Sequence, residues 1–257
     1  MYPMAPIAEI FLKQLGFFVL LLGGLTILEI FCGREPLTVT QRLRGLPFWG
    51  VQLSMVVLTS IGAGVLTHKF GLNGILGGRQ LPRPHGAIAA LIAALLFDLT
   101  FYWYHRFQHR FLWRWHAPHH AFRNLSAINS HHHWVEPFVY GAMVGFPLAL
   151  FGWWPDALPW LALIFTAQSY TIHSDLRFDV GPLRPFLIGP AYHRVHHSIE
   201  IEHRDKNFGA LTPLWDWLFG TLCWPDCRPA IGVVDFPEPS FKNWFFAPLR
   251  YPRSDRS

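Results

Sequence analysis

Histidines in this chain gather into short groups with the spacing of metal ligands. His105 and His109 form an H-x-x-x-H pair, and His173 stands alone later in the chain. Two further groups have the pattern H-x-x-H-H: His116, His119 and His120, then His193, His196 and His197. Residues three or four apart share a helix face, so each group can direct two imidazoles at one ion. The adjacent pair in H-x-x-H-H can serve two neighbouring ions, and we therefore predict a two-metal centre.

The number of histidines supports two ions rather than one. Of the 15 histidines, 13 lie between His105 and His203. A zinc ion takes about four ligands, so eight or nine converging imidazoles exceed the needs of one ion. Any single group could be a loose chelating tract, but three groups in order at helical spacing favour a structured site. Imidazole binds iron, zinc, copper and nickel alike, which leaves the metal undecided.

Apolar segments must position these histidines. The 257 residues are 51% hydrophobic and only 14% charged, against about 25% charged in an average soluble domain. Five segments approach the roughly 20 apolar residues that a bilayer core requires. They are residues 7–31, 48–67, 88–104, 138–154 and 158–172. The last two form either two spans or a re-entrant hairpin. We predict an all-α membrane bundle of four to five spans with a cytosolic histidine-bearing helical cap, in one domain covering residues 1–257.

The basic residues give the expected orientation. Arginines follow the first and third apolar segments, and ten Lys or Arg residues lie beyond His173. Cytoplasmic loops carry such an excess, so the histidine groups should face the cytosol, although Lys69, Arg79 and Arg83 in the opposite loop weigh against this. The N-terminus lacks the basic region of a secretory signal, so the first span should remain as an anchor. The net charge of +5 is accounted for by lipid headgroups, and we expect no nucleic-acid partner.

The motifs occur in a specific order. Residues 98–109 read DLTFYWYHRFQH and residues 113–120 read WRWHAPHH. The later motifs are YHRVHHS at 192–198, DKNFG at 205–209 and WDWLFGT at 215–221. Together they resemble the sterol desaturase and fatty acid hydroxylase superfamily over a histidine-box region of about residues 97–222.

This resemblance implies an integral membrane, non-haem oxidase with two iron ions that hydroxylates or desaturates a lipid. It implies O2 as co-substrate and electrons from outside the chain, and zinc is possible in the isolated protein. Carried over position by position, the implied metal ligands are His105, His109, His116, His119, His120, His173, His193, His196 and His197.

One segment departs from the family pattern. Members often have R-x-H-P-x-E after the second box, whereas residues 131–136 read HHHWVE. His133 aligns with the family histidine, but His131 and Trp134 replace its arginine and proline. His133 is therefore either a ligand, a group that supports a ligand, or part of a polar loop.

Two carboxylates lie in apolar segments, where an ionised group costs at least about 2.5 kcal/mol at the helix centre. Asp98 precedes His105 by two helical turns. It either accepts a hydrogen bond from a ligand imidazole, as a candidate catalytic residue, or pairs with an arginine near the interface. Glu29 ends the first span, where we predict an interfacial residue whose carboxylate reaches water.

The chain has no dinucleotide loop, haem attachment motif or ferredoxin cysteine set. We expect an external ferredoxin or cytochrome as electron donor, steered by basic residues such as Arg110, Arg114 and Arg204. The substrate is a lipid in the bilayer: a sterol, fatty acyl chain, alkylglycerol or carotenoid. The bacterial inner membrane is favoured over the endoplasmic reticulum. The alternative functions are a zinc-dependent membrane hydrolase, although no H-E-x-x-H is present, and a metal transporter.

Overall fold

Helices account for the regular structure in the computed structural model, which describes residues 4–69, 86–145, 158–224, 227–234 and 240–246. Within these ranges no strand forms, and β pairing is limited to isolated bridges between Gly33 and Leu176 and between Ser198 and Ile231. The prediction of an all-α fold is therefore confirmed for the described part of the chain.

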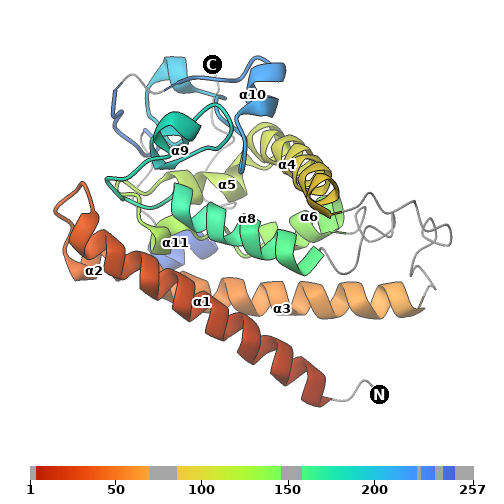
Figure 1. Cartoon of the computed structure of the whole chain (residues 1–257). Coiled ribbons are helices and arrows are strands. Elements are labelled where there is room, and N and C mark those ends of the chain that lie inside the picture. The colour runs from red at the N-terminus through yellow and green to blue at the C-terminus, as the bar shows by residue number, and fades with distance from the viewer. Residues whose placement is uncertain (1–3, 70–85, 146–157, 225–226, 235–239, 247–257) are drawn as a thin grey trace.

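The longest helices carry the apolar sequence. They are α1 (Met4–Cys32), α3 (Leu46–Lys69), α4 (Gly86–Phe111) and α8 (Leu158–Ile172). In Figure 1, α1 and α3 run along the lower edge of the molecule, below α8. Among the described helices only α1, through Leu15–Cys32, is long and apolar enough to cross a membrane. Three other predicted segments, 48–67, 88–104 and 158–172, lie within α3, α4 and α8. The end of the segment 138–154 lies outside the described residues.

Shorter helices lie around the long ones (Figure 1). They are α2 (Val39–Arg42), η1 (Leu43–Gly45), α5 (Trp113–His120), η2 (Ala127–Ser130), α6 (Glu136–Tyr140), the π-helical η3 (Gly141–Gly145), η4 (Gly181–Leu183), α9 (Pro190–His196), η5 (Ile201–His203), α10 (Leu214–Leu218) and α11 (Phe241–Phe245). Proline sets local boundaries here. Pro190 occupies the first turn of α9, where its missing N–H costs nothing. Pro118 lies inside α5, and that helix ends two residues later.

Glu29 corrects one prediction, because its carboxylate is fully buried instead of reaching water. Its Oε1 accepts hydrogen bonds from the backbone N–H groups of Ala127 at 2.8 Å and Asp175 at 3.0 Å. Arg42 Nη1 lies 3.3 Å from Oε2. Since two amides and a guanidinium replace water, the end of α1 is joined to η2 and to the segment that follows His173.

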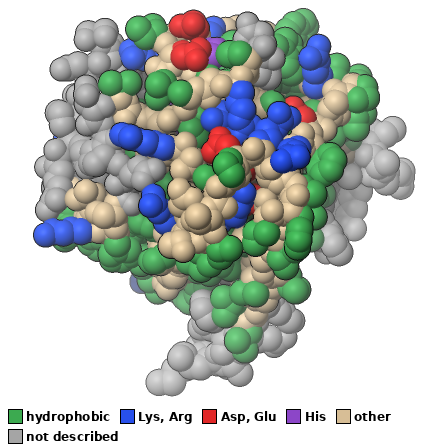
Figure 2. Space-filling model, turned by 90° about the vertical axis from the view of Figure 1, so that its left-hand side faces the viewer, with side chains coloured by type: hydrophobic (Ala, Val, Ile, Leu, Met, Phe, Trp, Pro, Cys, Tyr) green, Lys and Arg blue, Asp and Glu red, His purple; other side chains and the backbone are tan. Residues whose placement is uncertain are grey.

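The end of the molecule where α2 lies carries many cationic side chains. Figure 2 shows Lys and Arg gathered near the centre of this face around a few acidic groups, with hydrophobic side chains surrounding them. Large apolar side chains on the long helices are also exposed, including Leu20 at 78% and Phe31 at 80% on α1. Exposed apolar surface of this extent marks contact with a membrane or a partner.

Candidate metal centre

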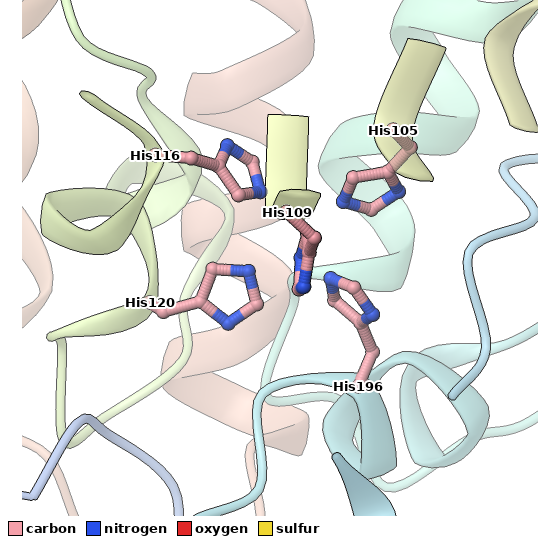
Figure 3. A group of neighbouring side chains, drawn as sticks. All are labelled: His105, His109, His116, His120 and His196. Carbon is pink, nitrogen blue, oxygen red and sulfur yellow. The ribbon is translucent and has the colours of Figure 1, made fainter. Parts of the chain in front are cut away.

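One group of buried histidines collects ligands from three helices. Each offers one ring nitrogen, and these nitrogens all lie within 4.8 Å of one another. The members are His105 and His109 of α4, His116 and His120 of α5, and His196 of α9. Figure 3 shows the five rings turned toward a common space. The H-x-x-x-H pair of α4 contributes both of its rings, as its helical spacing predicts.

A second group adjoins the first and contains His119, His173, His193 and His197. All four are buried. The Nε2 atom of His173 lies 3.1 Å from that of His119, 2.8 Å from that of His193 and 3.3 Å from that of His197. Four ligands about 2.1 Å from one tetrahedral ion would lie about 3.4 Å apart. The observed separations are close to that value.

Each H-x-x-H-H motif divides its adjacent pair between the groups. His119 belongs to the second group and His120 to the first, while His197 and His196 are divided in the same way. The rings of His120 and His197 stack with centroids 4.3 Å apart, which joins the two groups directly. The sequence pattern predicts this division, because neighbouring residues on a helix point about 100° apart.

The rings of the second group are protonated so that their Nε2 lone pairs can bind a cation. His119 Nδ1 donates to the carbonyl oxygen of His131 at 3.2 Å, and His173 Nδ1 donates to that of Ser169 at 2.6 Å. A carbonyl oxygen can only accept, so the proton of each neutral ring is on Nδ1. Two Nε2 lone pairs then face each other across 3.1 Å. Lone pairs at that distance repel unless a cation lies between them, so this donor set suits a metal ion.

The first group is oriented in the same way. His105 Nδ1 donates to Phe208 O at 3.0 Å, and His196 Nδ1 donates to Lys206 O at 2.8 Å. Among the described residues, Nε2 of His196 and of His120 is buried without a hydrogen-bond partner. A buried polar atom without a partner is costly, and a metal ion would satisfy both nitrogens.

Burial keeps these imidazoles neutral. It lowers the pKa of His105, His120 and His196 well below the ordinary value, and the neighbouring histidines lower it further. In the second group, burial likewise lowers the pKa of His193 and His197. Only the neutral ring has a lone pair to give to a metal, so the site is prepared for coordination at neutral pH.

Glu136 is a buried carboxylate that the sequence reasoning did not single out. Its Oε2 accepts from His116 Nδ1 at 3.0 Å and from His132 Nδ1 at 3.2 Å, and it also contacts the amide of Gln108. Burial by itself would raise the pKa of Glu136, but His132 and His116 more than offset this and lower it below its ordinary value. Glu136 is therefore ionised and fixes the ring of His116. The H-x-x-x-E spacing from His132 to Glu136 was the available signal.

The histidine triplet corrects the expectation for His133. Its ring lies beside Trp244, with centroids 5.4 Å apart, and its Nε2 is 3.4 Å from Phe245 O. It belongs to neither group of candidate ligands. His132 faces the site instead, and its ring stacks on His119 with centroids 4.2 Å apart.

Asp98 has partners that neither sequence alternative named. Its Oδ1 accepts from the N–H groups of Ala210 at 3.2 Å and Leu211 at 2.8 Å. Its Oδ2 accepts from the N–H of Thr212 at 3.0 Å and its hydroxyl at 2.8 Å. His105 was expected to donate a hydrogen bond to Asp98. It donates instead to the backbone carbonyl of Phe208. Asp98 therefore holds the 205–212 loop, which itself contacts the ligands.

Asp216 supports the same loop from the other side, and sequence reasoning missed it. Its carboxylate accepts from the N–H of Phe208 at 2.8 Å and of Gly209 at 2.7 Å. Asp205 and Asn207 have positive φ angles of 56° and 58°, a conformation that Asp and Asn tolerate better than most residues. These two residues turn the backbone around Lys206 O and Phe208 O, two of the four carbonyls that orient ligands.

Comparisons with known proteins agree with the motif order. The profile of the fatty acid hydroxylase family matches residues 90–221. Alkylglycerol monooxygenase of Danio rerio is 31% identical over 164 residues, 63% of this chain and 36% of that protein. Ornithine lipid hydroxylase OlsE of Rhizobium tropici is 28% identical over 194 residues, 72% of this chain and 57% of that protein.

Methylsterol monooxygenase 1-3 of Arabidopsis thaliana is 29% identical over 161 residues, 58% of this chain and 53% of that protein. In each of these three cases the match covers less than two thirds of the relative's own length. No solved structure matches the chain.

Proposed function

The chain belongs to the fatty acid hydroxylase family, and on that premise we propose that it is a membrane-bound oxidoreductase that uses O2 to hydroxylate or desaturate a lipid. The observation that carries the proposal is the convergence of nine buried histidines in two adjoining groups. The names of its relatives, which are monooxygenases and a hydroxylase of alkylglycerol, sterol and ornithine lipid, favour a lipid as the substrate.

The two groups would each hold one metal ion, and iron is the metal that suits oxidation. The group around His109 offers five imidazoles and the group around His173 offers four. Bound iron supplies the redox chemistry by which O2 oxidises an unactivated C–H bond. Zinc is the alternative occupant in protein isolated without added iron.

The protein's own groups hold the ligands rigidly and keep the site dry. The carbonyls of residues 131, 169, 206 and 208 fix the Nδ1 protons of four ligands, so their Nε2 atoms need no reorganisation on binding. The carboxylate of Glu136 fixes a fifth, His116. Such outer partners typically contribute 10- to 100-fold to metal affinity or activity.

The substrate would approach from the side of α4. Phe101 of α4 lies beside the histidines, with its ring centroid 5.5 Å from that of His105. Phe97 instead packs on Phe165 at 4.3 Å. We propose that Phe101 contacts the lipid chain near the reacting carbon.

The overall reaction balances with an external reductant. Hydroxylation consumes R–H, O2, two electrons and two protons and yields R–OH and water. Desaturation consumes two adjacent C–H bonds with the same O2, electrons and protons and yields C=C and two waters. A ferredoxin or cytochrome would supply the electrons, since the sequence has no dinucleotide loop, haem attachment motif or ferredoxin cysteine set.

The arrangement in the membrane is also part of the proposal. α1 would cross the bilayer, and α3, α4 and α8 would complete a multi-pass bundle in a bacterial inner membrane. The arginines that follow α1 and α4 favour a cytosolic position for the histidine groups, where a soluble electron donor can reach them.

Metal analysis of the purified full chain tests this function. Protein from iron-replete cells should hold about two irons in a coupled pair whose Mössbauer spectrum changes when dithionite and then O2 are added. Replacing His119 or His196 with alanine should abolish metal loading and lipid oxidation. The matched control is His203→Ala, because His203 is buried but lies outside both groups. One redox-silent zinc per chain would contradict the oxidase and favour the hydrolase or transporter.

A further inference from the structure

A cavity of about 310 Å³ lies beside α9 and has no part in the proposed chemistry. This volume is at the lower end of the 300–1,000 Å³ typical of small-molecule sites. Its lining includes four arginines, one carboxylate and one indole: Arg34, Arg184, Arg194, Arg228, Asp179 and Trp224. Such a lining predicts an anionic ligand.

Two of these arginines are already neutralised. Arg194 is almost buried, and its Nη1 lies 3.1 Å from Glu35 Oε1. Arg228 Nη2 lies 2.9 Å from the same oxygen and 2.7 Å from Asp175 Oδ1. These ion pairs form part of the cavity wall. The charge of an anion bound in the cavity must therefore be balanced by other residues.

The other two arginines have no carboxylate partner among the residues that the structure describes. Arg34 donates from Nη2 to Arg177 O at 3.0 Å, and the guanidinium of Arg184 lies 5.6 Å from the centroid of the Trp224 ring. Neither of these contacts neutralises a guanidinium, and Asp179 is the carboxylate that lines the cavity with them. Guanidinium groups bind phosphate with paired N–H donors, so each of the two can offer such donors to a phosphate in the cavity that both line.

The surface around the cavity indicates the source of that phosphate. The segment that leads to α9 exposes Phe178 by 71%, Phe186 by 69% and Leu183 by 54%. Leu187, from the same segment, lines the cavity itself. Exposed aromatic and aliphatic side chains beside arginines are typical of a surface at the level of lipid headgroups.

We propose that this cavity is a phosphate-binding site, and that Arg34 and Arg184 clamp the phosphate of an anionic phospholipid or of a free phosphate compound. The apolar rim favours the lipid. The site lies on α9, which also carries His193 and His196, so a bound headgroup would anchor the protein next to the metal centre. The proposal does not depend on the identity of the metal or on the reaction.

Titration of the detergent-purified full chain tests the site. Short-chain phosphatidylglycerol, short-chain phosphatidylcholine and inorganic phosphate are each titrated while heat release and thermal stability are measured. Phosphatidylglycerol should bind, and its affinity should fall at least about tenfold in R34Q/R184Q, because two charge-assisted contacts are lost. The control R123Q/K242Q removes the same charge from exposed positions outside the cavity and should bind as the wild type does.

The titrations distinguish a phospholipid from a soluble phosphate compound as the ligand of the cavity. Phosphatidylglycerol binding that is much tighter than phosphate binding supports the lipid, and equal binding of both supports a soluble phosphate compound. Metal content and helical circular dichroism should be unchanged in R34Q/R184Q, since both side chains are exposed. The proposal is overturned if phosphatidylglycerol and phosphate bind no better than phosphatidylcholine, or if the folded double variant binds as tightly as the control.

Discussion

Replacing Glu136 with glutamine tests whether a carboxylate outside the ligand set controls metal affinity. In the structure Oε2 accepts from His116, His132 and Gln108, and Oε1 accepts from the N–H of His133 at 2.9 Å. A glutamine must keep its oxygen toward the first three donors. Its NH2 group then faces the His133 N–H, and the bond to His116 becomes neutral.

The expected loss of metal affinity follows from that geometry. Charge-assisted hydrogen bonds are roughly twice as strong as neutral ones, and each contributes about 1.5–3 kcal/mol. Making the His116 bond neutral therefore removes about 1 kcal/mol, and less exact ring orientation adds to this. We expect metal affinity to fall at least about tenfold, within the range for outer partners of ligands.

The assay for Glu136→Gln is metal retention during equilibration with a graded series of chelators, measured by mass spectrometry of the metal. Glu200→Gln is the matched control, because Glu200 lies 3.4 Å from Nδ1 of His203, a histidine outside both groups. If Glu136→Gln retains metal as firmly as the wild type and the control, the argument that Glu136 orients His116 is refuted.

Three further predictions concern stability, measured by unfolding of the purified protein in detergent. Asp98→Asn turns an amide group toward the N–H of Thr212 and should destabilise the fold by about 2 kcal/mol; an unchanged transition would contradict the loop-holding role. Glu29→Ala leaves the charge of Arg42 buried and should cost about 3 kcal/mol, part of which returns when Arg42→Met is added. Burial lowers the pKa of His173 from 6.5 to about 3. Metal-free protein should therefore be fully stable above about pH 6.5 and lose about 1.4 kcal/mol per pH unit for each such histidine as the pH falls toward 3; a transition that does not change between pH 7 and 5 would contradict this.

Most features that could be predicted followed from the apolar segments and from the spacing of the histidines. The apolar segment 158–172 coincides with α8, and 48–67 lies within α3. Eight of the nine candidate ligands lie at helical spacing, and the ninth, His173, came from the family resemblance. The structure brings all nine into two groups. Helical geometry alone requires adjacent residues to diverge, which is why the division of His119 from His120 was predictable.

The triplet at 131–133 was not predictable, because its backbone is not helical. His131 has φ −65° and ψ 145°, which is extended. Side chains alternate along an extended backbone. His131 and His133 thus both lie near Trp244, with centroids 6.1 Å and 5.4 Å from its ring, and His132 turns to His119 on the other side. Alignment with the family pattern left the role of His133 open and did not point to His132, since it carried no information on this alternation.

The groups that accept hydrogen bonds from the candidate ligands show a second limit of sequence reasoning. Four of the nine candidate ligands donate from Nδ1 to backbone carbonyls, which any residue provides, so no residue type reveals these partners. Asp98 and Asp216 act one step further out, by holding the loop that supplies two of those carbonyls.

Neutral imidazoles and carbonyls would leave the charge of two divalent ions uncompensated. Among the described residues in contact with a candidate ligand ring, Glu136 is the buried carboxylate and Asp205, whose side chain is 46% exposed, is the other acidic group. Two divalent ions bound there would therefore retain net positive charge, and the loaded site should attract anionic oxygen ligands.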